Sequence, residues 1–413
     1  MWFSDVGRKR RLRNMLLIIF VVQIALMVRI GFIQFVQGTE LQAMAYSQQT
    51  LNRSINPKRG RILDRTGKVE LAVSASTETV SVNPTNIPSE KRGKLAEAMA
   101  NIFDLDYEKV LKRLKRRTSI EIITKKVDKE KTDKLRVWLA ENNITTGVNI
   151  DEDTKRYYPF STLASNIIGF TGSDNQGIVG LEVEYEEYLE GTKGKILTFT
   201  DAKGVELPEL AEGRVEGIAG KTLHTSLDVN IQKYAEQAAN KALEKKQAKY
   251  VSIIVMNPKN GEIYAMVNVP EFNLNTPFEL NYETDVPKDS DEYQKLLNKM
   301  WRNQCINDTY EPGSTFKIVT ATAGLETKVV DVNSVFSCPG FKIVEDRRIR
   351  CHKTTGHGSE TFLQGTMNSC NPVFIDVGLK VGAQKFYAQM KKLGLMQKTG
   401  IDIHPKAVIG DYF

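Results

Sequence analysis

A long apolar run near the N-terminus constrains this chain more than any other feature. Met15 to Val36 is apolar apart from isolated polar residues such as Gln23 and Arg29, and basic residues fill most of positions 8–13. A helix of about 20 apolar residues spans the hydrocarbon core of a bilayer. The run therefore predicts one membrane-spanning helix.

The charge on either side of this run predicts its orientation. Positive charge on the short N-terminal side favours a cytoplasmic location for residues 1–14. Residues 15–36 would then be a single-pass anchor in the cell membrane, with all later residues outside the cytoplasm. A cleaved signal peptide is the alternative, but no small-residue cleavage site follows the run. A buried core helix fits poorly with the N-terminal basic cluster.

Length, charge and cysteine content limit the possible folds of the residues after the anchor. The chain has 413 residues, enough for two or three domains, and a net charge of +7. Its lysines and arginines are spread out and form no aromatic-interleaved basic patch, so we expect no nucleic-acid partner. Its 4 cysteines are too few for a disulfide scaffold.

Residues 37–220 show short helical and strand patterns in alternation. Residues 37–56 predict a helical stalk that ends at Pro57. Residues 57–220 predict a mixed domain, a pedestal. Its expected elements are a strand–turn–strand over 57–74 with the turn at Thr66-Gly67, a helical region over 89–114 broken at 101–106, a strand over 118–127, a helix over 131–142, a strand over 148–151, a short acidic helix over 181–189 and a glycine-rich hairpin over 191–220.

A further domain is expected over residues 221–413. Thr222 to Ser226 reads as a strand and Asp228 to Lys245 as an amphipathic helix. Val251 to Met256 and Glu262 to Val269 read as antiparallel partners around a turn. An apolar helix over Ile318 to Leu325 comes next. The pattern predicts an α+β fold, with helices packed on an antiparallel sheet.

A Ser-x-x-Lys sequence lies just before that last helix. Pro312-Gly313 precedes Ser314, and Lys317 is one helical turn later on the same face. A serine hydroxyl is a poor nucleophile until a base takes its proton, and a partly desolvated lysine can be that base. Ser314 and Lys317 are therefore the candidate nucleophile and base. A chance match is the alternative, because the motif is short.

A second polar motif, Ser369-Cys370-Asn371, lies downstream. Serine and asparagine are also common helix caps. The order Ser-x-x-Lys and then Ser-x-Asn resembles the opening of the signature of penicillin-binding proteins and β-lactamases, which a Lys-Thr/Ser-Gly strand completes.

The resemblance extends along nearly the whole chain. Arg59-Gly60-Arg61-Ile62-Leu63-Asp64-Arg65, Arg156-Tyr157-Tyr158-Pro159 and Gly180-Leu181-Glu182 with Tyr185 resemble the pedestal, or dimerisation, domain of class B penicillin-binding proteins. Glu311 to Lys317 resembles their nucleophile segment. The chain is similar to the sporulation or division members of this family of peptidoglycan D,D-transpeptidases.

The family resemblance implies a role for each motif residue. Ser314 would attack the penultimate D-alanyl carbonyl of a stem peptide, and β-lactams would acylate the same serine. Lys317 would accept the hydroxyl proton, Ser369 would pass a proton to the leaving amine, and Asn371 would orient Lys317 and the substrate. The backbone N–H of Ser314 would form half of an oxyanion hole. The resemblance implies no cofactor, and it implies cell-wall synthesis proteins as partners.

Two sequences imitate the family motifs. Ser173-Asp174-Asn175 lies upstream of Ser314, and we interpret it as a turn. Lys398-Thr399-Gly400 follows the end of a helix at Gly394 and has no strand to hold it beside a substrate. We therefore expect the domain to be incomplete, ending before the catalytic Lys-Thr/Ser-Gly strand, and we expect slow acylation. A membrane-anchored scaffold without activity is the alternative function.

The cysteines allow more than one arrangement. We expect a Cys351–Cys370 disulfide beside the nucleophile, in an oxidising exterior compartment. A Cys338–Cys351 pair and a set of free thiols remain alternatives. A zinc site from Cys338, Cys351, His352 and His357 has suitable residue types, but its spacing fits no common zinc pattern, so no metal is assigned.

Other classes of related protein fit less well. A class A enzyme would carry a glycosyltransferase domain, for which the sequence holds no acidic motif. A β-lactam sensor would need several membrane helices.

Overall fold

The computed structural model describes residues 5–37, 50–199 and 213–403. The chain divides into two compact units. The N-terminal unit extends through Cys305, and the C-terminal unit covers Ile306–Pro405. This border lies inside the range 221–413 expected for a single further domain.

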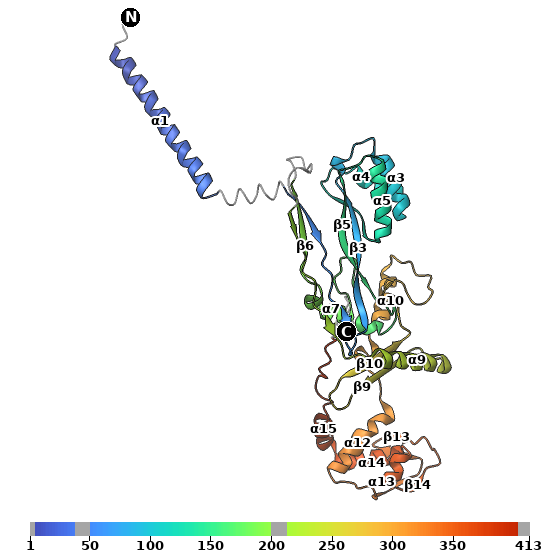
Figure 1. Ribbon diagram of the computed structural model, residues 1–413. Coiled ribbons are helices and arrows are strands. Elements are labelled where there is room, and N and C mark those ends of the chain that lie inside the picture. Colours follow the sequence, from blue (N-terminus) through green and yellow to red (C-terminus); the bar gives the residue numbers. More distant parts are fainter. Residues whose placement is uncertain (1–4, 38–49, 200–212, 404–413) are drawn as a thin grey trace. The chain divides into compact units, whose positions relative to one another are not determined.

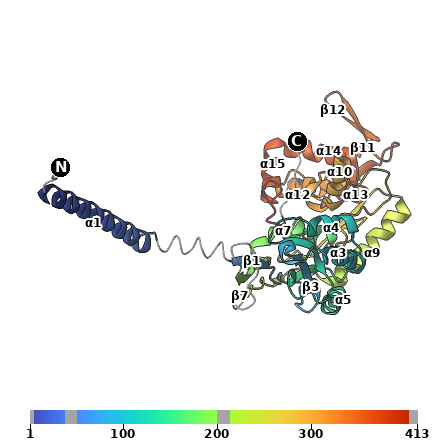
Figure 2. The ribbon, with the colours of Figure 1, turned by 90° about the horizontal axis from the view of Figure 1, so that it is seen from above.

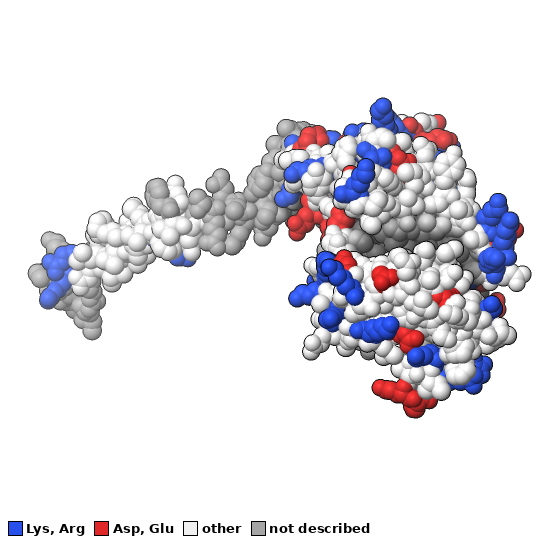
Figure 3. Space-filling view, turned by 90° about the horizontal axis from the view of Figure 1, so that it is seen from below, with Lys and Arg blue, Asp and Glu red and all other residues white. Residues whose placement is uncertain are grey.

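The apolar run forms one helix, α1 (Asp5–Phe35, 31 residues). Its segment Arg13–Gln34, 22 residues, is long and apolar enough to cross a membrane, and none of it is buried in the protein. Basic side chains, including Arg10 and Arg13, lie at one end, and the remaining surface of α1 is largely uncharged (Figure 3). The helix has the length and composition that the sequence predicts for an anchor.

The pedestal is built on two long antiparallel strands, β3 (Glu70–Val82) and β5 (Val148–Tyr157). They pair without interruption from Val73↔Tyr157 to Val82↔Val148. Strand β3 also pairs with β4 (Glu121–Val127) and β2 (Ile62–Leu63), and β2 pairs in parallel with β8 (Leu223–His224). The predicted turn at Thr66-Gly67 is confirmed, because Asp64 Oδ1 accepts the Thr66 N–H at 3.1 Å.

Three helices cover one end of this sheet (Figures 1 and 2). They bury apolar residues of β3 and β4 beneath them, and Val80, Leu95, Met99, Leu114 and Leu135 of this core are fully buried. The predicted helical region over 89–114 is two helices, with a left-handed residue at Asp104 ending the first. The helices are α3 (Arg92–Phe103), α4 (Tyr107–Leu114) and α5 (Lys129–Glu141), and a 3-10 turn, η1 (Pro84–Asn86), precedes them.

A second sheet corrects the predicted stalk helix. Residues Thr50–Ile55 form a strand, β1, which pairs with β6 (Gly194–Phe199). Strand β6 in turn pairs with β7 (Gly213–Val215), as the predicted hairpin over 191–220 requires. The helical prediction for 37–56 is therefore wrong over Thr50–Ile55, while residues 38–49 lie outside the described part. A partner strand far along the chain has overridden the local pattern.

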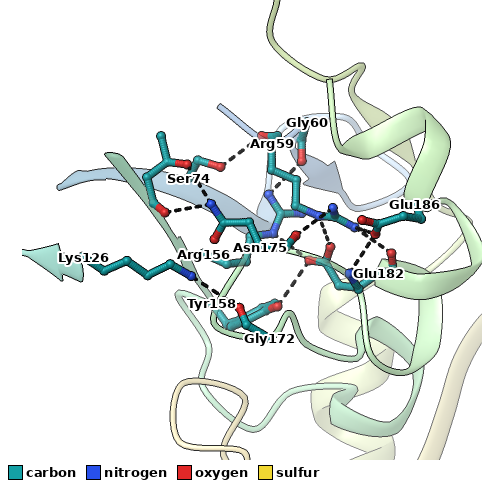
Figure 4. Close-up of polar contacts among 12 residues, drawn as sticks. Arg59, Gly60, Ser74, Lys126, Arg156, Tyr158, Gly172, Asn175, Glu182 and Glu186 are labelled. Carbon is teal, nitrogen blue, oxygen red and sulfur yellow. Dashed lines mark hydrogen bonds and ion pairs between the residues drawn. The ribbon is translucent and has the colours of Figure 1, made fainter. Parts of the chain in front are cut away.

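The base of the pedestal holds a buried ionic network, shown in Figure 4. The Glu182 carboxylate accepts from Arg59 Nε and from Arg156 Nε, each at 2.6 Å. Arg59 also donates to Glu186 at 2.6 Å, and the Tyr158 hydroxyl lies 3.3 Å from Glu182. All of these residues except Glu186 come from the three pedestal segments that resemble the family, so the network joins segments far apart in sequence.

Short helices and a turn complete this region. The predicted acidic helix over 181–189 is two short helices that meet at Tyr185. Ser173-Asp174-Asn175 is indeed a turn, between the paired residues Thr171 and Gly177. The helices are α6 (Ser165–Ile168), α7 (Gly180–Glu184) and α8 (Glu186–Leu189).

The last part of the N-terminal unit is a helix on a two-stranded sheet. The expected antiparallel pair is present, and Ala235 and Ala239 of the helix pack on Ala265, Val267 and Val269 of the second strand. The elements are α9 (Val229–Lys246), β9 (Val251–Met256), β10 (Ile263–Val269), α10 (Asp291–Trp301) and α11 (Gln304–Asn307), which crosses the border between the units.

The C-terminal unit packs four helices with two small strand pairs. Strand β11 pairs with β14, and β12 with β13. Its core includes Phe336, Phe362, Val373 and Val377, together with three cysteines. The elements are η2 (Gly313–Phe316), α12 (Lys317–Glu326), β11 (Val335–Cys338), β12 (Phe341–Val344), β13 (Arg347–Arg350), β14 (Gly358–Thr361), α13 (Phe362–Met367), α14 (Asn371–Val381) and α15 (Ala383–Lys392).

Candidate active site

The candidate nucleophile lies at the entrance to α12. Gly313 has a φ of 58°, a left-handed conformation that favours glycine, and it turns the chain into η2. Ser314 is exposed within η2, and α12 begins at Lys317. The predicted helix start is thus a single 3-10 turn followed by the α-helix, with Ser314 and Lys317 on successive turns.

The second motif forms the connection between α13 and α14. Ser369 adopts a φ of 48°, unusual for a residue with a side chain, and Cys370 precedes the first residue of α14, Asn371. Pro372 fits the first turn of that helix, where its missing N–H costs nothing. The sharp turn at Ser369 directs both the backbone carbonyl and the hydroxyl of this residue toward the same neighbour, Lys317.

The Lys317 amine joins the two motifs. Nζ donates to the Ser369 carbonyl at 2.7 Å, lies 3.1 Å from Ser369 Oγ and donates to Asn371 Oδ1 at 2.6 Å. It also lies 5.4 Å from the centre of the Phe374 ring, a cation–π distance. The structure thus brings together three of the four predicted site residues around one amine.

The surroundings of Lys317 change its protonation. The side chain is half-buried, and burial lowers the pKa of Lys317, while the thiols of Cys351 and Cys370 act in the opposite direction. A lysine with a lowered pKa has a larger neutral fraction near neutral pH and is a better proton acceptor. Burial therefore gives Lys317 a larger neutral fraction than an exposed lysine has at the same pH.

Two glycines let the helices of the site approach closely. A Cβ added at Gly324 of α12 would lie 2.7 Å from Val377 Cγ1 of α14, and one added at Gly365 of α13 would lie 2.8 Å from Val373 Cγ1. Neither position can hold a side chain without a shift. The close packing of α12 and α13 on α14 places Lys317 within reach of Ser369 and Asn371.

Two neighbours of the site were not predicted. The Arg350 carbonyl accepts from Asn371 Nδ2 at 2.8 Å, which turns Oδ1 toward Lys317. Phe374 follows Asn371 by three residues on α14, so helical spacing could have indicated it. Arg350 carried no such signal, because only the return of β13 to the start of α14 brings its carbonyl there.

No hydrogen bond in the described part of the chain joins the other candidates, Ser314 and Lys398, to this cluster. Within the described residues, the Ser314 hydroxyl has no hydrogen bond, and Lys398 is exposed and makes none to Ser369. Lys398 belongs to no strand.

The cysteines differ from the predicted arrangement. All four are free thiols, so the predicted Cys351–Cys370 disulfide is not formed. Instead, Cys338, Cys351, Cys370 and His357 gather in one group, with their ligand atoms within 4.8 Å of one another. The zinc set considered from the sequence included His352. The group in the structure contains Cys370 instead. Cys305, half-buried, lies in the N-terminal unit.

Comparison with protein families matches both halves of the chain. Residues 54–225 match the penicillin-binding protein dimerisation domain, and residues 251–408 match the penicillin-binding protein transpeptidase domain. The chain belongs to the class B penicillin-binding proteins. The predicted α+β fold of this penicillin-binding protein, with an N-terminal apolar helix, a dimerisation domain and a transpeptidase domain, is confirmed.

Individual relatives agree with this assignment. The chain is 35% identical over 405 residues to stage V sporulation protein D of Bacillus subtilis (strain 168), covering 97% of the chain and 59% of the relative. It is 27% identical over 395 residues to peptidoglycan D,D-transpeptidase FtsI of Buchnera aphidicola subsp. Schizaphis graminum (strain Sg), covering 94% and 64%. The chain therefore spans about three-fifths of the length of these curated relatives.

A solved structure shows the same fold. The penicillin-binding protein PBP2 of Helicobacter pylori, in a complex with MreC, matches with a TM-score of 0.64 and 26% identity, covering 86% of this chain and 67% of that one.

Proposed function

We propose that this penicillin-binding protein cross-links peptidoglycan by serine acyl transfer from a D-Ala-D-Ala stem peptide, and that β-lactams acylate the same serine. The observation that carries the proposal is the Lys317 amine, which contacts both Ser369 and Asn371 one helical turn after Ser314. Relatives named peptidoglycan D,D-transpeptidases support it.

Acylation begins at the exposed Ser314. Lys317, with its lowered pKa, takes the hydroxyl proton, and Ser314 Oγ forms a bond to the penultimate D-alanyl carbonyl carbon. The backbone N–H of Ser314 faces the negative charge that develops on the carbonyl oxygen. The C–N bond to the terminal D-alanine then breaks, and the Ser369 hydroxyl passes a proton to the leaving amine.

Deacylation completes the cross-link. The amine of a second stem peptide attacks the acyl-enzyme, loses its proton through the same lysine and serine, and releases Ser314. Because Asn371 Nδ2 is held by the Arg350 carbonyl, its Oδ1 keeps Lys317 in place throughout both steps.

Labelling with a fluorescent penicillin tests the proposal on the full chain. The wild type should form a covalent adduct, and Ser314→Ala should form none. Thr322→Ala removes a hydroxyl elsewhere on α12, one that only bonds the Ile318 carbonyl, and should label like the wild type. A wild type that folds but takes no label would overturn the proposal and favour a membrane-anchored scaffold.

Helix α1 indicates where the protein is located in the cell. We infer that α1 anchors the chain in the cell membrane with its basic end in the cytoplasm and both units outside. Protease added to intact protoplasts should digest the chain beyond Val36. Protection of that region would contradict the topology.

The related structure points to a class of partner. The Helicobacter pylori relative was solved with MreC. We infer that the dimerisation domain, 54–225, contacts a protein of the cell-wall synthesis machinery outside the membrane. Site-specific crosslinking from exposed pedestal residues in cells should give adducts with such a protein. Adducts confined to crosslinkers placed in the C-terminal unit would contradict this.

A further inference from the structure

Three thiols and one imidazole converge inside the C-terminal unit. Cys338 ends β11, Cys351 follows β13, His357 precedes β14, and Cys370 precedes α14. Their four ligand atoms lie within 4.8 Å of one another, and the three cysteines are buried. Four separate turns of the chain thus contribute one metal-ligating group each.

The spacing within the group fits a tetrahedral ion. Cys351 Sγ lies 3.7 Å from His357 Nδ1. With metal–sulfur bonds of about 2.3 Å, neighbouring ligands of a tetrahedral zinc lie about 3.5–3.8 Å apart. Small side-chain rotations would bring the other ligands to that separation.

A buried carboxylate lies beside the imidazole of this group. Glu360 is 4% exposed, and its Oε1 has no hydrogen-bond partner. This oxygen lies 3.8 Å from His357 Nδ1, while the other oxygen accepts from Asn368 at 2.9 Å. Carboxylates commonly lie beside the histidine ligands of metal sites and help to orient them. Glu360 is the buried carboxylate beside His357.

The loops around the group are tightly built. Gly340 and Gly356 have φ values of 93° and 86°. A Cβ at Gly340 would lie 2.1 Å from the Thr354 carbonyl oxygen, and one at Gly356 would lie 2.3 Å from the Cys338 carbonyl oxygen. The Cys351 N–H also donates to the Gly340 carbonyl at 2.9 Å. The two ligand-bearing loops therefore pack directly on each other.

We propose that Cys338, Cys351, His357 and Cys370 bind one zinc ion as a Cys₃His site. Sulfur-rich tetrahedral ligand sets select zinc among the common divalent ions. Four protein ligands leave no open position, which is typical of a structural site. A disulfide could use only two of the three thiols and would leave the third beside the imidazole, whereas a metal uses all four groups.

The site connects directly to the second motif. Cys370 stands between Ser369 and Asn371, the two contacts of the Lys317 amine. Zinc would tie the start of α14 to the β11 and β13 turns and so hold both contacts in position. This consequence rests on the proposed transpeptidase function, whereas zinc binding itself does not.

Metal content tests the site without any assay of activity. The full chain, purified in detergent under reducing conditions, should contain about one zinc ion per chain by mass spectrometry. His357→Ala and Cys338→Ser should each lose it. His357→Cys should retain zinc, because it creates a four-thiolate set, and this variant separates ligand loss from misfolding.

Control variants distinguish the four ligands from other residues of the chain. Cys305→Ser and His352→Ala remove a cysteine and a histidine outside the ligand set and should keep the metal. Ser314→Ala should also keep it, so a failure of the proposed function and a failure of the site are distinguishable. Cobalt added to the metal-free chain should give the thiolate charge-transfer bands of a tetrahedral sulfur site.

Three results would overturn the proposal. One is a wild-type chain without metal after purification and zinc reconstitution. Another is a Cys351–Cys370 disulfide in that chain by peptide mapping. The third is equal loss of zinc in His352→Ala and His357→Ala.

Discussion

At the scale of single residues, the geometry of one amine joins the two motifs. Ser-x-x-Lys and Ser-x-Asn could be read from the sequence because each motif fixes its residues locally. The pairing of cysteines could not, because residue types alone do not distinguish a disulfide from a metal site. Because Cys370 is next to Ser369, the sequence suggests a disulfide at this position. The structure shows that His357 and Cys338 also lie beside Cys370.

Changing Lys317 tests its role as base. The neutral fraction of the Lys317 amine increases as pH rises, so penicillin acylation should increase with pH. Because burial lowers the pKa of Lys317, the midpoint of this increase should lie below that of an ordinary lysine. Lys317→Arg keeps the charge but stays protonated, and should slow acylation about a hundredfold or more. Acylation rates measured across pH would check both. An unchanged rate in the variant would remove Lys317 from the proton transfer.

A second residue-scale prediction concerns the pedestal network. Glu182→Gln leaves Arg59 and Arg156 buried without their shared carboxylate. Breaking a buried ion pair in this way costs about 3–5 kcal/mol, so the variant should unfold at lower denaturant concentration. Glu187→Gln, on the neighbouring short helix but exposed, should have little effect. Equal stability of the two variants would show that the network adds nothing.

At the scale of elements, most helices and strands followed from local pattern, and the exceptions have a common cause. Over Thr50–Ile55 the predicted helix gives way to β1, because its partner β6 lies more than a hundred residues later and no local pattern records that pairing. The predicted strand over 148–151 continues to Tyr157 for a similar reason, since β3 pairs along its whole length. Long-range pairing outweighs weak local preference.

The contact between α12 and α14 gives a prediction at this scale. Gly324→Val forces a side chain against Val377 and Val330, and overpacking of this kind costs about 1–3 kcal/mol. It should also move Lys317 from Asn371 and slow penicillin acylation. Gly378→Ala is the matched control, because its Cβ would lie 3.9 Å from Thr320. Thermal unfolding and labelling rates would check both variants, and normal labelling in Gly324→Val would contradict the argument.

At the scale of the whole molecule, the border near Cys305 could not be predicted. The sequence pattern from Lys221 onward reads continuously as helices and strands. The division instead follows from which apolar residues share a core: Ala235 and Val267 belong to one, and Phe336 and Val373 to another. No short stretch of sequence records this grouping.

Separate cores predict separate unfolding. Calorimetry of the full chain should resolve two transitions. Glu182→Gln should lower the transition temperature of the N-terminal unit alone. Gly324→Val should lower that of the C-terminal unit alone, because distant substitutions act independently. A single transition shifted equally by both variants would show that the units unfold together.

The pairing of β2 with β8 has a consequence for how the chain is made. Ile62 meets Leu223 about 160 residues later, and closing so long a loop costs roughly 4–5 kcal/mol of chain entropy. Strand β1 likewise waits for β6. Strand β2 pairs with β3 soon after it emerges, but its other edge stays open until β8 is made. Until β6 and β8 emerge, the unpaired edges of β1 and β2 can join other chains, so slow synthesis exposes this protein to aggregation at these strands.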